Sequence, residues 1–364
     1  MNIKDEIMEG LNEKINAKFE EMNNKSLRGS VVAKAISETP IDEIEDKELR
    51  QKAYADAFVG EWMRKGRITE KAINYFESAV DANGGYAVPQ TLFDKIIARA
   101  GTVNVMRDLA TIYKTSTNSM ELVVELEADG FQAEWSGESD AKGDSTGTGF
   151  EKVTLECFDI YAKPKATLRN LSDNAFNLES YIIEKIGMAF GKKTGNAYLL
   201  GDGTGKPTGL LPAITATGLA TASTITFGEL NTLLYSLKQE YADNGVWLMS
   251  RKTLGAINSI VDTQGQPIFR MPEVRQEGSK VDGYLLNYPV RLDDNMPDIQ
   301  TAVANDVVIA FGDFRRAYAI VDHDGMFQER DTLTETGFVK FPTIMRTGGK
   351  PVLPEAVIGL KQIA

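Results

Sequence analysis

Two glycine-rich stretches, far apart in the chain, constrain its fold more than any other feature of the sequence. The first is Asn-Gly-Gly-Tyr-Ala-Val-Pro at residues 83–89, and the second spans residues 200–210. Glycine permits positive φ angles and close backbone approach, and proline fixes an extended exit. Both stretches are therefore interpreted as shaped backbone crossings between larger elements. The second contains four glycines and a proline: Gly201, Gly203, Gly205, Pro207 and Gly209.

Composition excludes several functional classes. The chain has 364 residues, 42% of them hydrophobic, which is enough for two compact domains. Its net charge of -12 argues against a broad basic surface for DNA or acidic membranes. Cys157 and His323 are the only cysteine and histidine, so an intrachain disulfide is excluded and a zinc or copper site is not expected. Without a signal peptide pattern or a long apolar run, we expect a soluble protein with no membrane partner.

The N-terminal region differs from the rest because it lacks glycine-rich turns and is dense in charged residues. An apolar stripe with helical spacing predicts a helix of about 22 residues. This helix packs either on its own domain or against another subunit in a coiled coil. A second amphipathic stretch follows over residues 41–64. The stripe consists of Ile3, Ile7, Leu11, Ile15, Phe19 and Met22.

Residues 120–167 predict two strands around a long polar tip. Leu122 and Val124 alternate with glutamates on the outgoing strand, and Val153 and Leu155 alternate on the return. The tip, residues 130–149, is rich in Gly, Ser, Asp and Thr. Because an isolated hairpin is marginal in water, we expect support from outside the monomer.

A long helix is predicted over residues 172–200. Gly187, Gly191 and Gly195 stand four apart on one of its faces, where each glycine costs roughly 0.5–1 kcal/mol relative to alanine. Either another backbone packs closely there or the helix bends, and we hypothesise bending during a conformational change of the assembled protein. Residues 222–325 then alternate helix and strand, and Thr226 with Glu229 predicts a capping box.

Several chemical sites fail on spacing. Counting back from Gly205-Lys206 puts Leu200 where a phosphate-binding P-loop needs glycine, and Pro207 takes the hydroxyl position. The Rossmann glycine pattern also fails.

The single histidine and the single cysteine do not indicate catalysis. His323 is interpreted as a solvated turn residue after a strand, so a serine or cysteine nucleophile would have no histidine to act as its general base. Cys157 is interpreted as a small buried residue. Three aspartates are interpreted as parts of a solvated acidic loop: Asp293, Asp294 and Asp298.

Taken in order, the glycine motifs resemble those of the major capsid proteins of tailed bacteriophages, which have the Hong Kong 97-type fold. The resemblance covers residues 83–360. It rests on the two stretches above, on Phe311-Gly312-Asp313 and Arg346-Thr347-Gly348-Gly349, and on a middle block from Trp247 to Pro267.

The resemblance implies an α+β capsid fold with a helical N-terminal segment, an N-arm, an E-loop hairpin, a peripheral domain and an axial domain. The helical segment, residues 1–76, would act as a built-in scaffold, which either stays or is removed by a protease. The remaining divisions are the N-arm at 77–110, the E-loop hairpin at 111–170, the peripheral domain with its spine helix at 171–221 and 326–364, and the axial domain at 222–325.

The implied function is self-assembly into an icosahedral shell of pentamers and hexamers around double-stranded DNA, without sequence-specific DNA binding, enzymatic activity or a cofactor. Assembly would take place in the cytoplasm of the host bacterium, with a portal protein and with protease, scaffold or decoration proteins as further partners. No covalent cross-linking is expected. The alternatives are an encapsulin-type bacterial compartment and a nucleotide-binding enzyme. The expected inter-subunit contact residues are Trp135, Lys142, Asp144, Gly84 and Tyr86.

Overall fold

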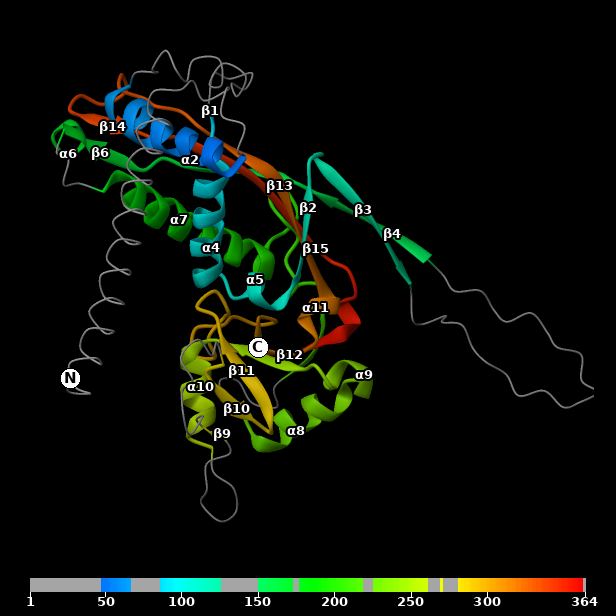
Figure 1. The fold of residues 1–364 in the computed structure, drawn as a ribbon. Coiled ribbons are helices and arrows are strands. Elements are labelled where there is room, and N and C mark those ends of the chain that lie inside the picture. The colour runs from blue at the N-terminus through cyan, green and yellow to red at the C-terminus, as the bar shows by residue number, and fades with distance from the viewer. Residues whose placement is uncertain are drawn as a thin grey trace, which may run out of the picture. The chain divides into compact units, whose positions relative to one another are not determined.

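The computed structural model describes residues 47–66, 86–125, 150–172, 177–218, 225–260, 269–270 and 281–362 (Figure 1). Helices and strands are mixed throughout, in agreement with the predicted α+β class. The chain forms two compact units, each assembled from three separate stretches. The first unit comprises Met1–Asp94, Lys165–Ser180 and Phe327–Phe341, and the second comprises Lys95–Pro164, Tyr181–Met326 and Pro342–Ala364.

The first unit begins with the second amphipathic stretch of the sequence. Its residues form α2 (Lys47–Ala57), which continues as the π-helix η2 (Phe58–Met63). The unit also holds β1 (Tyr86–Ala87), which pairs with the end of β13 (Tyr318–Gln328). The remaining elements are α6 (Leu168–Ser172) and an antiparallel pair, β6 (Lys165–Thr167) with β14 (Phe338–Lys340). The predicted helix over residues 3–22 lies outside the described residues.

A seven-stranded sheet forms the main core of the second unit, in the order β7-β16-β12-β8-β11-β10-β9. All six residues of its inner strand β12 are buried, which explains why this strand is an almost continuous apolar run. Apolar residues of α8 (Phe227–Ser236) and α10 (Arg251–Asn258) belong to the same core. The strands are β7 (Thr215–Gly218), β8 (Val246–Met249), β9 (Phe269–Arg270), β10 (Gly283–Leu285), β11 (Tyr288–Leu292), β12 (Val307–Gly312) and β16 (Val357–Lys361).

This sheet combines segments that the sequence assigns to different domains. Strands β7 and β16 come from the expected peripheral segments 171–221 and 326–364, whereas β8 to β12 come from the expected axial segment 222–325. β16 pairs with β12 along five residue pairs, and β7 pairs with β16. β16 and β8 are the two hydrogen-bonded neighbours that β12 needs, and β7 forms the edge of the sheet beside β16.

The predicted capping box before α8 is confirmed. The Thr226 side chain accepts a hydrogen bond from the backbone amide of Glu229 at 3.3 Å, and the Glu229 carboxylate accepts one from the amide of Thr226 at 2.7 Å. The two bonds satisfy donors that the first turn of a helix leaves free. Helix α9 (Gln239–Ala242) follows α8.

A second sheet in this unit contains β13, β15 (Thr343–Pro351) and β5 (Phe158–Ala162), with β2 (Thr111–Thr115) parallel to β13. His323 lies inside β13, where it pairs with Thr115, so its interpretation as a turn residue is wrong. The acidic and glycine residues around it are typical of turns. Pairing with β2, with β15 and, at its end, with β1 nevertheless keeps the strand extended as far as Gln328.

Four more helices lie wholly or mostly in the second unit. The predicted long helix is α7 (Leu178–Leu200), which starts later than expected because Asn177 caps it: its side chain accepts from the amide of Ser180 at 3.0 Å. The others are α4 (Gln90–Val103), α5 (Met106–Leu109) and α11 (Phe314–Ala317).

Candidate assembly surfaces

The predicted hairpin is formed by β3 (Ser119–Glu125) and β4 (Phe150–Glu156), which pair antiparallel over seven residues (Figure 1). Its inner face carries Leu122, which packs with Val153 against Val321 of β13. Its outer face is open, and Val123 there is 63% exposed. The predicted alternation is therefore confirmed for these strands, and the outer face is available to a partner.

Most of the predicted contact residues lie outside the described residues: Gly84 precedes β1, and Trp135, Lys142 and Asp144 belong to residues 126–149. Tyr86 is described. It is half-buried, its strand pairs with Gln328, and its ring centroid lies 5.1 Å from that of Trp62. The Tyr86 side chain thus has an apolar neighbour within its own chain.

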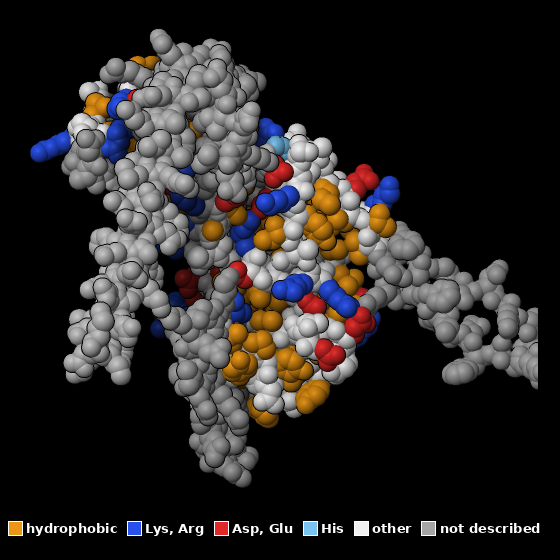
Figure 2. Space-filling view, viewed as in Figure 1, with side chains coloured by type: hydrophobic (Ala, Val, Ile, Leu, Met, Phe, Trp, Pro, Cys, Tyr) orange, Lys and Arg blue, Asp and Glu red, His pale blue; other side chains and the backbone are white. Residues whose placement is uncertain are grey.

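A second exposed apolar surface lies on α8. Phe227 and Tyr235 are eight residues apart and so share one face of the helix, with exposed fractions of 44% and 78%. Figure 2 shows hydrophobic side chains gathered where Figure 1 draws this helix. Sequence reasoning missed this surface and Val123, although each is signalled by an apolar residue at an outward-facing position of its element.

The loop between α7 and β7 closes tightly on itself. The amide of Gly209 donates to the carbonyl of Gly201 at 2.8 Å, and the amide of Gly201 donates to Ala197 at 2.9 Å. A Cβ on Gly201 would lie 2.0 Å from the carbonyl oxygen of Pro207. Gly203 and Gly205 have φ angles of 78° and 65°. Glycine is therefore required by close approach at one end of the loop and by positive φ at its tip.

This loop meets the C-terminal glycine pair, which the sequence places 140 residues away. The amide of Thr208 donates to the carbonyl of Gly349 at 3.0 Å, and the Tyr318 hydroxyl donates to the carbonyl of Thr208 at 2.7 Å. These amides of the loop are engaged within the protein, so they do not form the ring of free donors that binds phosphate. The geometry supports the interpretation of the loop as a structural joint.

Next to this joint lies a buried polar network that sequence reasoning missed. The Arg107 guanidinium forms a two-pronged ion pair with the Asp322 carboxylate, and their side chains are only 6% and 7% exposed. The Thr347 hydroxyl donates to the same carboxylate at 2.8 Å. That bond uses its one proton, so the Tyr198 hydroxyl, 2.7 Å away, donates to Thr347.

The groups of the network are buried, and their charges interact. Burial, followed by the nearby Asp322 charge, raises the pKa of Tyr198 above its ordinary value. Burial by itself would lower the pKa of Arg107, but its bonds and charge interaction with Asp322 outweigh burial and raise it. The network ties together α5, β13, β15 and α7. Because its members are so far apart in the chain, only Thr347, within a glycine motif, had a sequence signal.

Close packing accounts for the glycine stripe on α7. A Cβ on Gly191 would lie 2.7 Å from the carbonyl oxygen of Ala100, and one on Gly187 would lie 2.8 Å from the Cβ of Arg99, both on α4. At Gly195 the neighbour is Asn295, at 3.0 Å. Of the two explanations for the stripe, these distances support close approach of another element. Bending during shell expansion stays a prediction.

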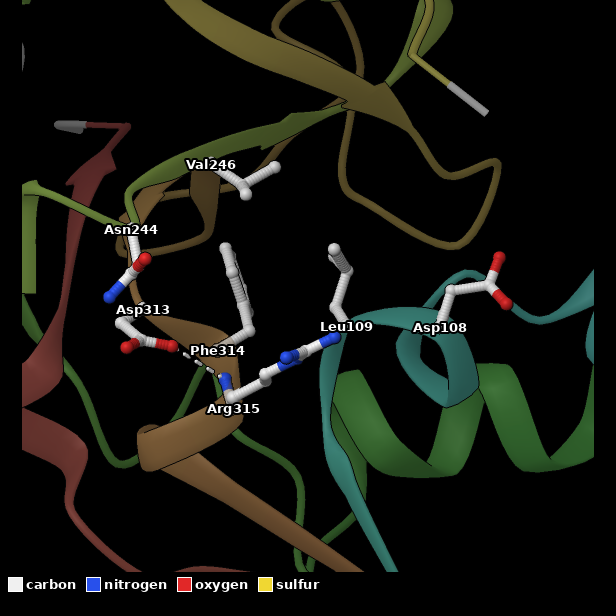
Figure 3. A pocket seen from close by; sticks show the side chains of 7 residues that line it. All are labelled: Asp108, Leu109, Asn244, Val246, Asp313, Phe314 and Arg315. Carbon is white, nitrogen blue, oxygen red and sulfur yellow. Dashed lines mark hydrogen bonds between the residues drawn. The ribbon is translucent and has the colours of Figure 1, made fainter. Parts of the chain in front are cut away.

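A cavity of about 320 Å³ lies beside α11 (Figure 3). Its two carboxylates already have structural partners. Asp313 accepts from the amide of Arg315 at 3.0 Å as the cap of α11, and Asp108 pairs with Arg291 at 3.0 Å. The cavity therefore lacks a carboxylate pair set apart for acid–base chemistry.

The acidic loop after β11 differs from its predicted solvated state. Asp293 is only 2% exposed, and burial raises the pKa of its carboxyl group. It accepts hydrogen bonds from the backbone and side chain of Asn295 at 2.8 and 2.7 Å. The interpretation is wrong for Asp293 because its amide donates to Met249, which folds the loop back onto β8.

Among the described residues, no three or more His, Cys, Asp or Glu side chains are grouped so that they could hold a metal ion. Nor does any helix in this part of the chain combine the length and the apolar character needed to cross a membrane.

Comparisons with known proteins converge on one family. The phage capsid family profile matches residues 84–362. A structure described as "Capsid of empty GTA particle" has a TM-score of 0.62 at 26% identity, covering 71% of this chain and 89% of its own. The corresponding native GTA particle gives 0.59 at 26% identity, covering 73% and 91%. A structure from Mycobacterium phage Adephagia, at 16% identity with coverage of 71% and 89%, shares the fold with a TM-score of 0.51.

A comparison with curated protein sequences gives no significant match. The family match includes the loop at residues 200–210, the C-terminal glycine pair that it meets and the sheet that β16 completes. The chain therefore belongs to the phage capsid family: it is a major capsid protein with the Hong Kong 97-like fold, a structural component of the virion and not an enzyme.

Proposed function

We propose that this capsid protein assembles with copies of itself into a closed icosahedral shell of pentamers and hexamers around double-stranded DNA. The observation that carries the proposal is the likeness to the GTA capsid, which covers 89% of that chain. The acidic net charge supports enclosure of DNA without a strong grip on it. Many weak contacts summed over a closed shell give high stability.

The proposed inter-subunit contacts are the β3–β4 hairpin with its tip, including Trp135, Lys142 and Asp144, and the N-arm around Gly84 and Tyr86. Support comes from the open outer face of the hairpin, where Val123 is 63% exposed. We also propose that residues 1–76 assist assembly, that the shell is built in the bacterial cytoplasm, and that a portal protein and protease, scaffold or decoration proteins take part.

The test is negative-stain electron microscopy of the full chain expressed alone, at several salt and protein concentrations. Closed hollow particles are the expected result. Monomers under every condition, even after a separate scaffold protein from the same genome is added, would contradict self-assembly.

A further inference from the structure

The helix at residues 47–66 is built into the first unit by a row of buried side chains. Tyr54, Phe58, Trp62 and Met63 are only 5%, 0%, 6% and 0% exposed. Phe58 and Met63 are five residues apart in η2, and the wider π-helical turn places both on the buried side of the helix. π-helical turns are frequent at functional sites. Burial of this extent is typical of a core element and exceeds what a loosely attached extension would show.

An aromatic row connects this helix to the strand after it. The ring centroids of Tyr54 and Phe58 lie 5.9 Å apart, those of Phe58 and Trp62 4.7 Å apart, and those of Trp62 and Tyr86 5.1 Å apart. The Tyr54 hydroxyl also donates to the carbonyl of Ala87 in β1 at 2.6 Å. The row therefore continues directly from the helix into the part of the chain that the family profile matches, which begins at residue 84.

The end of the helix is fixed by Arg330, which follows β13. Its Nε atom donates to the carbonyl of Met63 at 3.0 Å. The helix stops at Gly66, whose amide donates to Trp62 at 2.9 Å and whose φ is 69°. A Cβ there would lie 2.6 Å from the Arg330 guanidinium, so glycine fits this turn both by conformation and by space.

We propose that residues 47–66 are a permanent part of the folded subunit and stay docked in the finished shell, so that any N-terminal part released during assembly ends before Lys47. This rests on the proposed shell function and narrows the scaffold role of residues 1–76. The helix and the strand that it contacts belong to one unit, and the buried Trp62 ring packs on Tyr86. Its removal would expose that contact to water.

The first test is peptide mapping by mass spectrometry of particles assembled from the full chain in the presence of the proposed protease partner and then washed. The expected result is one copy of residues 47–66 for each copy of a β12 peptide. Particles that lack residues 47–66 would overturn the inference and leave the shell function intact.

The second test does not need particles, so it separates the inference from shell function. Hydrogen exchange of the full chain is expected to be at least 100-fold slower for amides of residues 58–64 than for an unstructured peptide. Trp62→Ala should reduce this protection at least 10-fold. Lys65→Ala should leave it unchanged, because the exposed Lys65 side chain bonds to Glu61 one turn earlier on the same helix. Gly66→Ala is a second variant, which should reduce the same protection less than Trp62→Ala does. Unprotected amides in the wild-type chain, or equal protection in Trp62→Ala and Lys65→Ala, would refute docking.

Discussion

The seven-stranded sheet and the β3–β4 hairpin show opposite uses of β-structure in one protein. Every residue of β12 is buried, and strands pair with it on both sides. The hairpin has two strands, one apolar face on β13 and one open face with Val123. Because two strands alone are marginal in water, the hairpin depends on neighbours for support.

The buried sheet and the open face of the hairpin contribute to different properties: the first to the stability of the subunit, the second to assembly. Apolar area buried within the chain stabilises the subunit, whereas apolar area left open is available to a partner. Substitutions in the sheet should therefore unfold the subunit, and substitutions on the open face should affect the shell while the subunit stays folded.

The largest effect is expected for Trp247→Ala in β8. Its ring is fully buried, lies 4.4 Å from that of Phe311, and donates from Nε1 to the carbonyl of Leu285 at 3.0 Å. Loss of this packing should reduce the free energy of unfolding by about 3–5 kcal/mol. Denaturant unfolding of the unassembled chain measures it. Tyr284→Ala, at a 43% exposed site of the same sheet, is the control and should cost much less.

Arg107→Ala should cost nearly as much, because it leaves the buried Asp322 carboxylate without its cation. Removing one partner of a buried ion pair typically costs about 3–5 kcal/mol. The double variant Arg107→Met with Asp322→Leu should recover part of this loss, since no charge remains buried. If the single and double variants unfold at the same denaturant concentration, the unpaired Asp322 charge is not the cause of the stability lost in Arg107→Ala.

Gly191→Ala should be destabilising by about 1–3 kcal/mol, because its Cβ meets the backbone of α4. Gly101→Ala on α4 is the matched control: apart from its own helix, none of the described residues has an atom within 4 Å of a Cβ there, so alanine should be neutral or slightly stabilising. Thermal unfolding of both variants decides between packing and bending. Normal stability in Gly191→Ala combined with impaired shell expansion would favour the bending hypothesis.

Val123→Ser should have the smallest effect on the subunit, within about 0.5 kcal/mol, because the side chain is on the surface. Shell yield should nevertheless fall, since the open face of the hairpin loses apolar area. Val303→Ser, at a 67% exposed site away from the hairpin, should leave the yield unchanged. Equal particle counts for both variants by electron microscopy would remove the hairpin face from the set of contacts.

Local patterns predicted local structure well in this chain. The alternation around Leu122, the capping box at Thr226 and the helical spacing before Leu200 each correspond to an observed element. They succeeded because strand period, cap chemistry and helix period depend on neighbouring residues only. His323 was misplaced because pairing with β2 overrides the turn preference of its neighbours.

The sequence by itself determined the family, the order of the elements and the places where only glycine fits. Tertiary structure alone decided that Gly209 and Gly349 meet at one joint, that Arg107 finds Asp322 across 215 residues, and that β16 returns to the central sheet. The physical reason is that a backbone signal is local, whereas burial and pairing depend on which distant segments the fold brings together.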